Sequence, residues 1–282
     1  MEHGLKVVAE GMQFPESPRW SDRDGCLYLV DWTADRVLKV KNNRLETCFE
    51  LPGGGPSGLC QDAQGNLWLC LYSGRKLAAY TPQGKLLGKW ADCQATPFKG
   101  PCDLVCDRGG GVYFTDSGNF EEDWHSGRAA GAIYYLASKD SQPRCLTRSL
   151  HFPNGIALSN DGTYLYVNEH RRNRTLRYSV AEDGTLRERQ EFFVYDHECL
   201  LALHEAFELG PDGMCVDDQD NLFVAHYGAG KVLHLSPQGD LLQVIHLPRG
   251  RRPTSVAYHT DEQAIFITEA EFGLLYRFCL AG

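Results

Sequence analysis

One segment of this sequence recurs six times, and a different residue stands at the first position of each copy. The copies begin at Glu16, Ser57, Cys102, Asn154, Asp212 and Thr254. An aromatic residue follows eleven or twelve positions later in every copy: Tyr28, Trp68, Tyr113, Tyr166, Phe223 and Phe266. A turn rich in Asp, Gly and Asn lies between the two positions, so each copy predicts a strand, a turn and a second strand.

The spacing of the copies favours a β-propeller. Successive copies start 41 to 58 residues apart, which suits a four-stranded blade better than a helical repeat of about 33 or 34 residues. We therefore expect an all-β fold, a six-bladed propeller of four-stranded antiparallel blades spanning residues 1–282 as a single domain. The sixth copy lacks a fourth strand after Phe278. Residues 5–9 are expected to supply that strand and close the ring, which leaves no free sheet edge.

The architecture gives the first position of the copies a chemical meaning. Innermost strands line the central channel of a propeller, so the six first residues form a ring around the axis. Glu16, Asn154 and Asp212 would bring two carboxylates and an amide oxygen together, and such hard oxygen ligands suit a divalent cation such as calcium. Without a cation the two carboxylates would repel each other, and at least one pKa would rise. Contact with channel water is the simpler explanation for Ser57 and Thr254.

Composition limits the partners and the location. A formal net charge of −9, from 28 basic and 37 acidic residues, argues against a nucleic-acid partner, because phosphate binding favours a basic face. No apolar run reaches the ~18 residues of a membrane span, so we expect no membrane association. Eleven cysteines, an odd number, and a polar N-terminus without a signal-peptide core predict reduced thiols in a cytoplasmic protein.

Two segments are longer than the repeat requires, residues 117–131 and 195–210. The second contains good helix formers, with apolar residues at positions 200, 203 and 207. It is expected to form a short helix, either as a lid or substrate wall above the channel or as an exposed decoration with a packing face.

Three motifs around the ring residues resemble a known family. They are Phe14-Pro15-Glu16-Ser17-Pro18-Arg19-Trp20, Phe152-Pro153-Asn154-Gly155-Ile156-Ala157 and Gly210-Pro211-Asp212-Gly213-Met214. Their identity and order resemble the six-bladed propellers of the senescence marker protein, gluconolactonase and luciferin-regenerating enzyme family. The resemblance implies a divalent metal, usually Ca²⁺ and sometimes Zn²⁺ or Mn²⁺, held by Glu16, Asn154 and Asp212. It also implies lactone hydrolysis, with the metal as Lewis acid on the carbonyl and Asp212 as general base for the attacking water.

The third copy departs from the family pattern. The family usually carries Arg-x-Asn-Asp here, whereas this chain has Gly100-Pro101-Cys102-Asp103. Lys99 is a candidate to replace the lost positive charge in substrate binding. Cys102 has three interpretations: a neutral pocket wall that touches substrate, a soft ligand that shifts the metal from calcium toward zinc or iron, or a catalytic nucleophile with a lowered pKa beside a cation.

Five polar residues lie three positions after the aromatic of their copy: Asp31, Asp116, Glu169, His226 and Glu269. A hydrogen-bonded turn is the expected role for this position. Glu169 and His226 are in addition candidates for substrate binding.

The function predicted from these observations is a metal-dependent hydrolase that acts on a small-molecule lactone or related cyclic ester. One alternative is a different metal-dependent reaction on the same scaffold in which Cys102 takes part directly. The other is a non-catalytic binding propeller, which would need no converging carboxylates. The natural substrate and the oligomeric state are left open.

Overall fold

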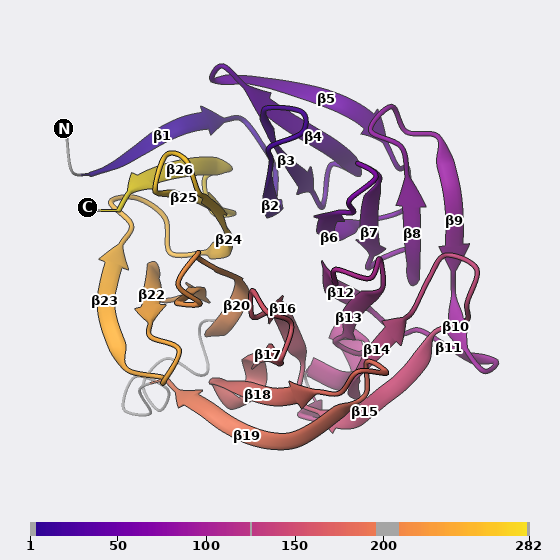
Figure 1. Ribbon diagram of the computed structural model, residues 1–282. Helices are drawn as coiled ribbons and strands as arrows, with labels where there is room; N and C mark the ends of the chain where they lie inside the picture. The colour runs from indigo at the N-terminus through magenta and orange to yellow at the C-terminus, as the bar shows by residue number, and fades with distance from the viewer. Residues whose placement is uncertain (1–3, 125, 196–208, 281–282) are drawn as a thin grey trace.

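The computed structural model describes residues 4–124, 126–195 and 209–280, and within them six four-stranded antiparallel sheets surround one axis (Figure 1). Blade one consists of β2 (Pro15–Ser21), β3 (Cys26–Asp31), β4 (Arg36–Lys41) and β5 (Arg44–Glu50). Blade two consists of β6 (Pro56–Gln61), β7 (Leu67–Leu71), β8 (Lys76–Tyr80) and β9 (Leu86–Trp90). Blade three consists of β12 (Pro101–Cys106), β13 (Val112–Asp116), β14 (Gly131–Leu136) and β15 (Arg144–Leu150). Blade four consists of β16 (Pro153–Leu158), β17 (Tyr164–Glu169), β18 (Arg174–Val180) and β19 (Leu186–Val194). Blade five consists of β20 (Gly210–Val216), β21 (Leu222–Tyr227), β22 (Lys231–Leu235) and β23 (Leu241–His246). The predicted six-bladed propeller is confirmed.

The sixth blade joins the two ends of the chain. Its strands are β24 (Pro253–His259), β25 (Ala264–Glu269), β26 (Leu274–Cys279) and, on the outside, β1 (Leu5–Glu10). β1 pairs antiparallel with β26, from Leu5 opposite Phe278 to Glu10 opposite Leu274. The N-terminal strand therefore closes the ring, as predicted.

The hydrophobic core lies between the faces of neighbouring blades. One cluster, for example, contains Trp68 and Leu77 of blade two and Phe114 and Tyr134 of blade three. The second strand of a blade is covered on both faces, and every residue of β3, β7 and β13 is buried. The outermost strands β9 and β23 are largely exposed. None of the described segments forms a helix long and apolar enough to cross a membrane.

Each inner strand carries the same local irregularity at its ring residue. A proline stands directly before all six ring residues: Pro15, Pro56, Pro101, Pro153, Pro211 and Pro253. Proline suits the beginning of a strand, where its missing N–H costs no ladder bond. The pairing with the second strand shifts register immediately afterwards in every blade. Such bulges redirect a side chain, and here they lie where the ring residues face the channel.

Buried carboxylates hold the loops that lead into four inner strands. Asp31 accepts the N–H groups of Gln13 at 3.0 Å and Phe14 at 2.8 Å, just before Glu16. Equivalent bonds join Asp116 to the N–H groups of Lys99 and Gly100, Glu169 to that of His151, and Glu269 to that of Arg252. The turn role predicted for this repeat position is confirmed for these four carboxylates.

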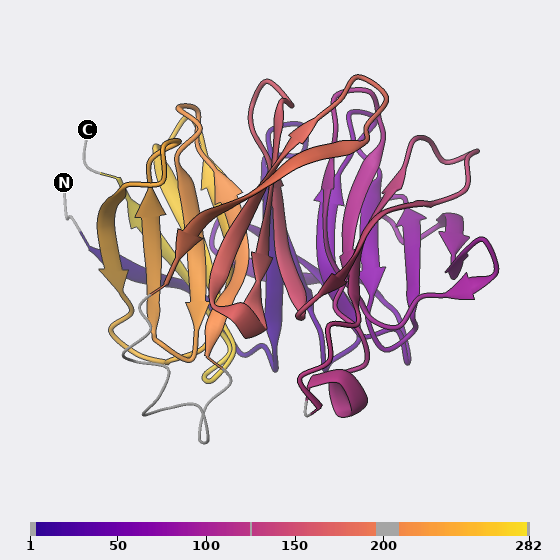
Figure 2. The same ribbon diagram turned by 90° about the horizontal axis from the view of Figure 1, so that it is seen from below.

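The ring residues lie near one face of the propeller, and the connections between the second and third strands lie on the same face. They include the π-helical turn η1 (Phe120–Trp124) between β13 and β14 and the 3₁₀ turn η2 (His170–Arg172) between β17 and β18. Figure 2 shows η1 projecting past the ends of the strands on that face. This face carries the entrance to the cavity described next.

Candidate functional site

Five of the six ring residues line one cavity at the end of the channel. The cavity is bordered by Glu16, Ser57, Cys102, Asn154 and Asp212. The sixth ring residue, Thr254, is fully buried and donates its hydroxyl to the carbonyl oxygen of Pro15 at 2.6 Å. Segments almost 200 residues apart in the sequence therefore meet at this cavity.

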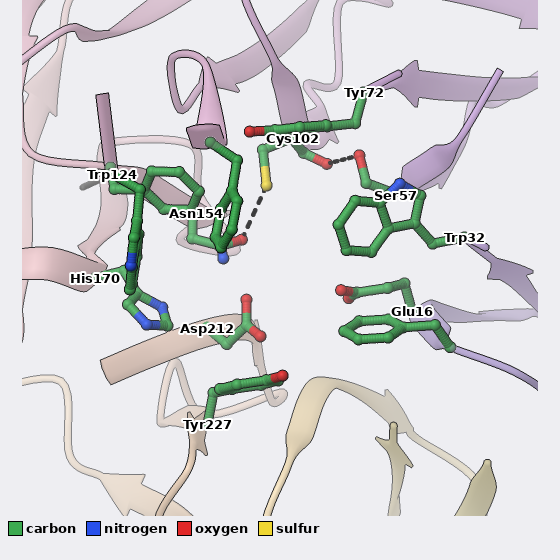
Figure 3. A pocket seen from close by; sticks show the side chains of 13 residues that line it. Glu16, Trp32, Ser57, Tyr72, Cys102, Trp124, Asn154, His170, Asp212 and Tyr227 are labelled. Carbon is green, nitrogen blue, oxygen red and sulfur yellow. Dashed lines mark hydrogen bonds between the residues drawn. The ribbon is translucent and has the colours of Figure 1, made fainter. Parts of the chain in front are cut away.

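Two carboxylates face each other across the cavity. Figure 3 shows the side chains of Glu16 and Asp212 pointing toward a common centre, with the amide of Asn154 beside them. Burial raises the pKa of Glu16 well above its ordinary value of 4.5, and the negative charges of Asp212 and Asp103 raise it further. Asp103 is a third buried carboxylate in the channel, 4.0 Å from a guanidinium nitrogen of Arg19. The electrostatic environment of Glu16 therefore favours a positive charge.

Cys102 lies beside Asn154 and interacts with it. Its Sγ donates to Oδ1 of Asn154 at 3.2 Å (Figure 3). Burial raises the pKa of the Cys102 thiol well above its ordinary value. The thiol thus has a proton to donate, and the bond fixes the orientation of the Asn154 amide.

The chemistry of the lining fits a hard cation. Two carboxylates and one amide oxygen point into the cavity, and neither Lys nor Arg is among the residues that line it. Within the described ranges, no three His, Cys, Asp or Glu side chains form a metal-binding cluster. A cation at this position would therefore depend on the amide oxygen of Asn154 as its third protein ligand.

Three residues predicted to contact substrate are not part of the lining. Lys99 pairs through Nζ with Asp123 at 3.2 Å. Glu169 is fully buried and forms an ion pair with Arg174. His226 is buried, with Nε2 2.8 Å from Oδ1 of Asn173, and burial lowers its pKa to about 3. All three are engaged in contacts that stabilise connections, so the structure does not bring them to the cavity.

Most of the lining is aromatic, which the sequence analysis did not predict. The rings are those of Phe14, Trp32, Tyr72, Phe120, Trp124, Phe152 and Tyr227, with the imidazole of His170 beside them. A sequence signal existed for half of this set. Trp32, Tyr72, His170 and Tyr227 each lie four positions after the aromatic of their copy, at the end of the second strand or directly beyond it.

The two long segments differ in what the structure describes. The segment 117–131 contains η1, and two of its rings, Phe120 and Trp124, line the cavity. The helix and lid expected in the segment 195–210 fall outside the described residues, except at Tyr195, Leu209 and Gly210. In the segment 117–131, His125 lies outside the described residues as well.

Comparison with known proteins agrees with this architecture. The chain matches the SMP-30/Gluconolactonase/LRE-like region over residues 39–97 and 89–271. A lactonase drp35 from Staphylococcus epidermidis is 28% identical over 272 residues, covering 94% of this chain and 76% of that protein.

Two solved structures share the fold. A gluconolactonase from Xanthomonas campestris superposes with a TM-score of 0.83 at 23% identity, covering 98% of this chain and 89% of the other. Regucalcin from Agrobacterium tumefaciens, a calcium-binding protein, gives a TM-score of 0.77 at 18% identity, covering 98% and 93%. With the family match across most of its length, this chain belongs to the SMP-30/gluconolactonase/LRE-like family.

Proposed function

We propose that this protein is a divalent-metal-dependent hydrolase of lactones or related cyclic esters. The observation that carries the proposal is the convergence of Glu16, Asn154 and Asp212 in a cavity that neither Lys nor Arg lines. Membership of the family and the lactonase relatives support the reaction class.

Glu16, Asn154 and Asp212 would hold the cation. All three offer oxygen, which favours Ca²⁺, while Zn²⁺ and Mn²⁺ are possible substitutes. Three protein ligands leave coordination positions for water and for substrate, because Ca²⁺ takes six to eight oxygen ligands. The calcium-binding regucalcin has the same fold, which supports this choice.

The bound cation would supply Lewis acidity at the lactone carbonyl and stabilise the oxyanion that forms there. Asp212 would accept the proton of the water that attacks the carbonyl carbon. The ring C–O bond then breaks, and the departing alkoxide takes up a proton to give the hydroxy acid. The apolar walls keep bulk water from the carboxylates, which strengthens these interactions.

In this proposal Cys102 is a positioning residue. Its thiol donates to Oδ1 of Asn154 and so directs the other lone pair of that oxygen toward the cavity. This role differs from those of soft ligand and nucleophile, for which the sulfur would need to be a thiolate.

Metal binding and hydrolysis should be measured on the same variants. We expect about one Ca²⁺ per chain by calorimetry on chelator-treated protein, and Ca²⁺-dependent hydrolysis of a panel of lactones by pH-stat titration. Glu16→Gln and Asp212→Asn should lower Ca²⁺ affinity at least tenfold and abolish turnover. Ser57→Ala is the matched ring control, because the Ser57 hydroxyl already donates to the carbonyl oxygen of Cys102 at 2.8 Å.

Cys102→Ala separates the alternatives. A positioning role predicts weaker Ca²⁺ binding and reduced but measurable turnover. Loss of turnover with unchanged Ca²⁺ affinity would instead identify Cys102 as a nucleophile. Absence of divalent-cation binding, or full activity of Asp212→Asn, would refute the proposed hydrolase.

A further inference from the structure

The walls of the cavity are chemically uniform. Trp32 meets Phe14 edge to face at 5.0 Å and Tyr72 at 5.7 Å on one side. On the other side Trp124 packs against Phe152 at 4.8 Å and against the ring of His170 at 5.3 Å. Figure 3 shows Trp32 across the cavity from Trp124, with Glu16 on the same side as Trp32 and Asp212 between His170 and Glu16.

The hydroxyls of Ser57 and Tyr72 and the thiol of Cys102 already have partners in these walls. The hydroxyl of Ser57 donates to the carbonyl oxygens of Cys102 at 2.8 Å and Pro101 at 3.2 Å. The hydroxyl of Tyr72 donates to the carbonyl oxygen of Gly118 at 3.0 Å. The thiol of Cys102 donates to Asn154.

The remaining polar groups of the lining are those of the three proposed metal ligands, the imidazole of His170, the hydroxyl of Tyr227 and the indole N–H groups of Trp32 and Trp124. A sugar-derived six-membered lactone carries four hydroxyl groups. The aromatic faces that make up most of these walls offer a hydroxyl no conventional hydrogen-bond partner, and each hydroxyl buried against them without a partner weakens binding by about tenfold or more.

We infer that the substrate of this site is an apolar cyclic ester whose ring carries an aryl or alkyl group, and not the polyhydroxylated lactone of a sugar acid. The inference rests on the proposed hydrolase function. Flat aromatic walls bury a flat apolar ring with favourable stacking. The aromatic walls thus determine specificity, while the carboxylate end carries the chemistry.

Two lactones of equal ring size test the inference on the Ca²⁺-loaded full-length protein. We expect kcat/KM for a benzo-fused six-membered lactone to exceed that for glucono-1,5-lactone at least 100-fold. Calorimetry with the corresponding lactams, which resist hydrolysis, measures binding apart from turnover. The benzo-fused lactam should bind, and the polyhydroxylated lactam should bind at least 100-fold more weakly.

A pair of tryptophan variants locates the preference. Trp32→Ala should weaken binding of the benzo-fused lactam about tenfold and leave the Ca²⁺ stoichiometry unchanged. Trp90→Ala is the matched control, because Trp90 stacks on Trp68 at 5.3 Å and does not line the cavity. Should Trp32→Ala fail to fold, the selectivity of the unmodified protein still decides the question.

The outcomes separate the two proposals. Hydrolysis of both lactones with equal efficiency, or with preference for glucono-1,5-lactone, overturns the inferred substrate class and leaves the hydrolase intact. Failure to hydrolyse any lactone with Ca²⁺ bound overturns the hydrolase and the substrate class together.

Discussion

Asp31 is the residue whose replacement should best reveal how the scaffold supports the site. Its carboxylate is completely buried. Oδ1 accepts hydrogen bonds from the backbone N–H groups of Gln13 and Phe14. Oδ2 accepts hydrogen bonds from Nη2 of Arg36 at 2.8 Å and from its Nε at 3.1 Å. It thus joins the loop before Glu16 to the edge of β4. We expect Asp31→Asn to destabilise the protein and to weaken metal binding at Glu16.

The magnitude follows from the two oxygens. An asparagine can keep its oxygen at the Oδ1 position and retain the backbone bonds. Its NH₂ group then faces the guanidinium of Arg36, which loses its buried partner. Arg36 is 28% exposed, so water compensates in part, and the cost should fall at the lower end of the 3–5 kcal/mol found for broken buried ion pairs, about 3 kcal/mol.

Urea unfolding followed by tryptophan fluorescence measures this loss, which corresponds to roughly 5–10 °C in Tm. Glu46→Gln is the matched control in the same blade, because Glu46 and Lys39 form an ion pair with side chains 53% and 35% exposed. Its cost should stay below about 1 kcal/mol. Equal effects of the two variants would refute the reasoning that burial of the carboxylate decides the cost.

Two further predictions concern stability and closure. His226 is buried and its pKa is lowered to about 3. Below pH 6.5, the ordinary pKa of histidine, His226 therefore binds a proton in the unfolded chain but not in the folded protein. The free energy of unfolding consequently decreases as the pH falls from about 6.5 toward 3, by up to about 1.4 kcal/mol per pH unit. The pH dependence of the urea midpoint should be shallower in His226→Gln, and parallel curves would contradict this assignment. Deletion of residues 1–10 removes β1 and exposes the edge of β26, so light scattering should detect association; a monomer with unchanged Tm would show that closure is dispensable.

Part of the site was predictable because the repeat shows which positions are equivalent in the six blades. Equivalent positions in equivalent blades meet at the channel, so Glu16, Asn154 and Asp212 could be assigned to one place across almost 200 residues. The carboxylate at the end of β3, Asp31, was predictable in the same way. Lys99 was proposed because of its charge and Glu169 because of its repeat position, and the contacts of both side chains lie elsewhere.

The aromatic walls were not predicted, for a physical reason. An aromatic residue in a β protein is usually core, and sequence alone does not distinguish a ring packed between blades from one that faces a cavity. Phe120 and Trp124 belong to a π-helical turn in the segment 117–131, which is not part of the repeat. The repeat therefore gives no indication of where these two rings lie.

The sequence by itself determined the architecture, since blade number, strand order and closure by residues 5–9 follow from a period that only one fold satisfies. It also determined which oxygen-bearing side chains meet at the end of the channel. Tertiary structure decided which side chains surround them, because only the fold shows which rings of five blades face the cavity and which pack between blades. It also decided which charges are paired away from the cavity, because ion pairs depend on distances that no spacing along the chain encodes.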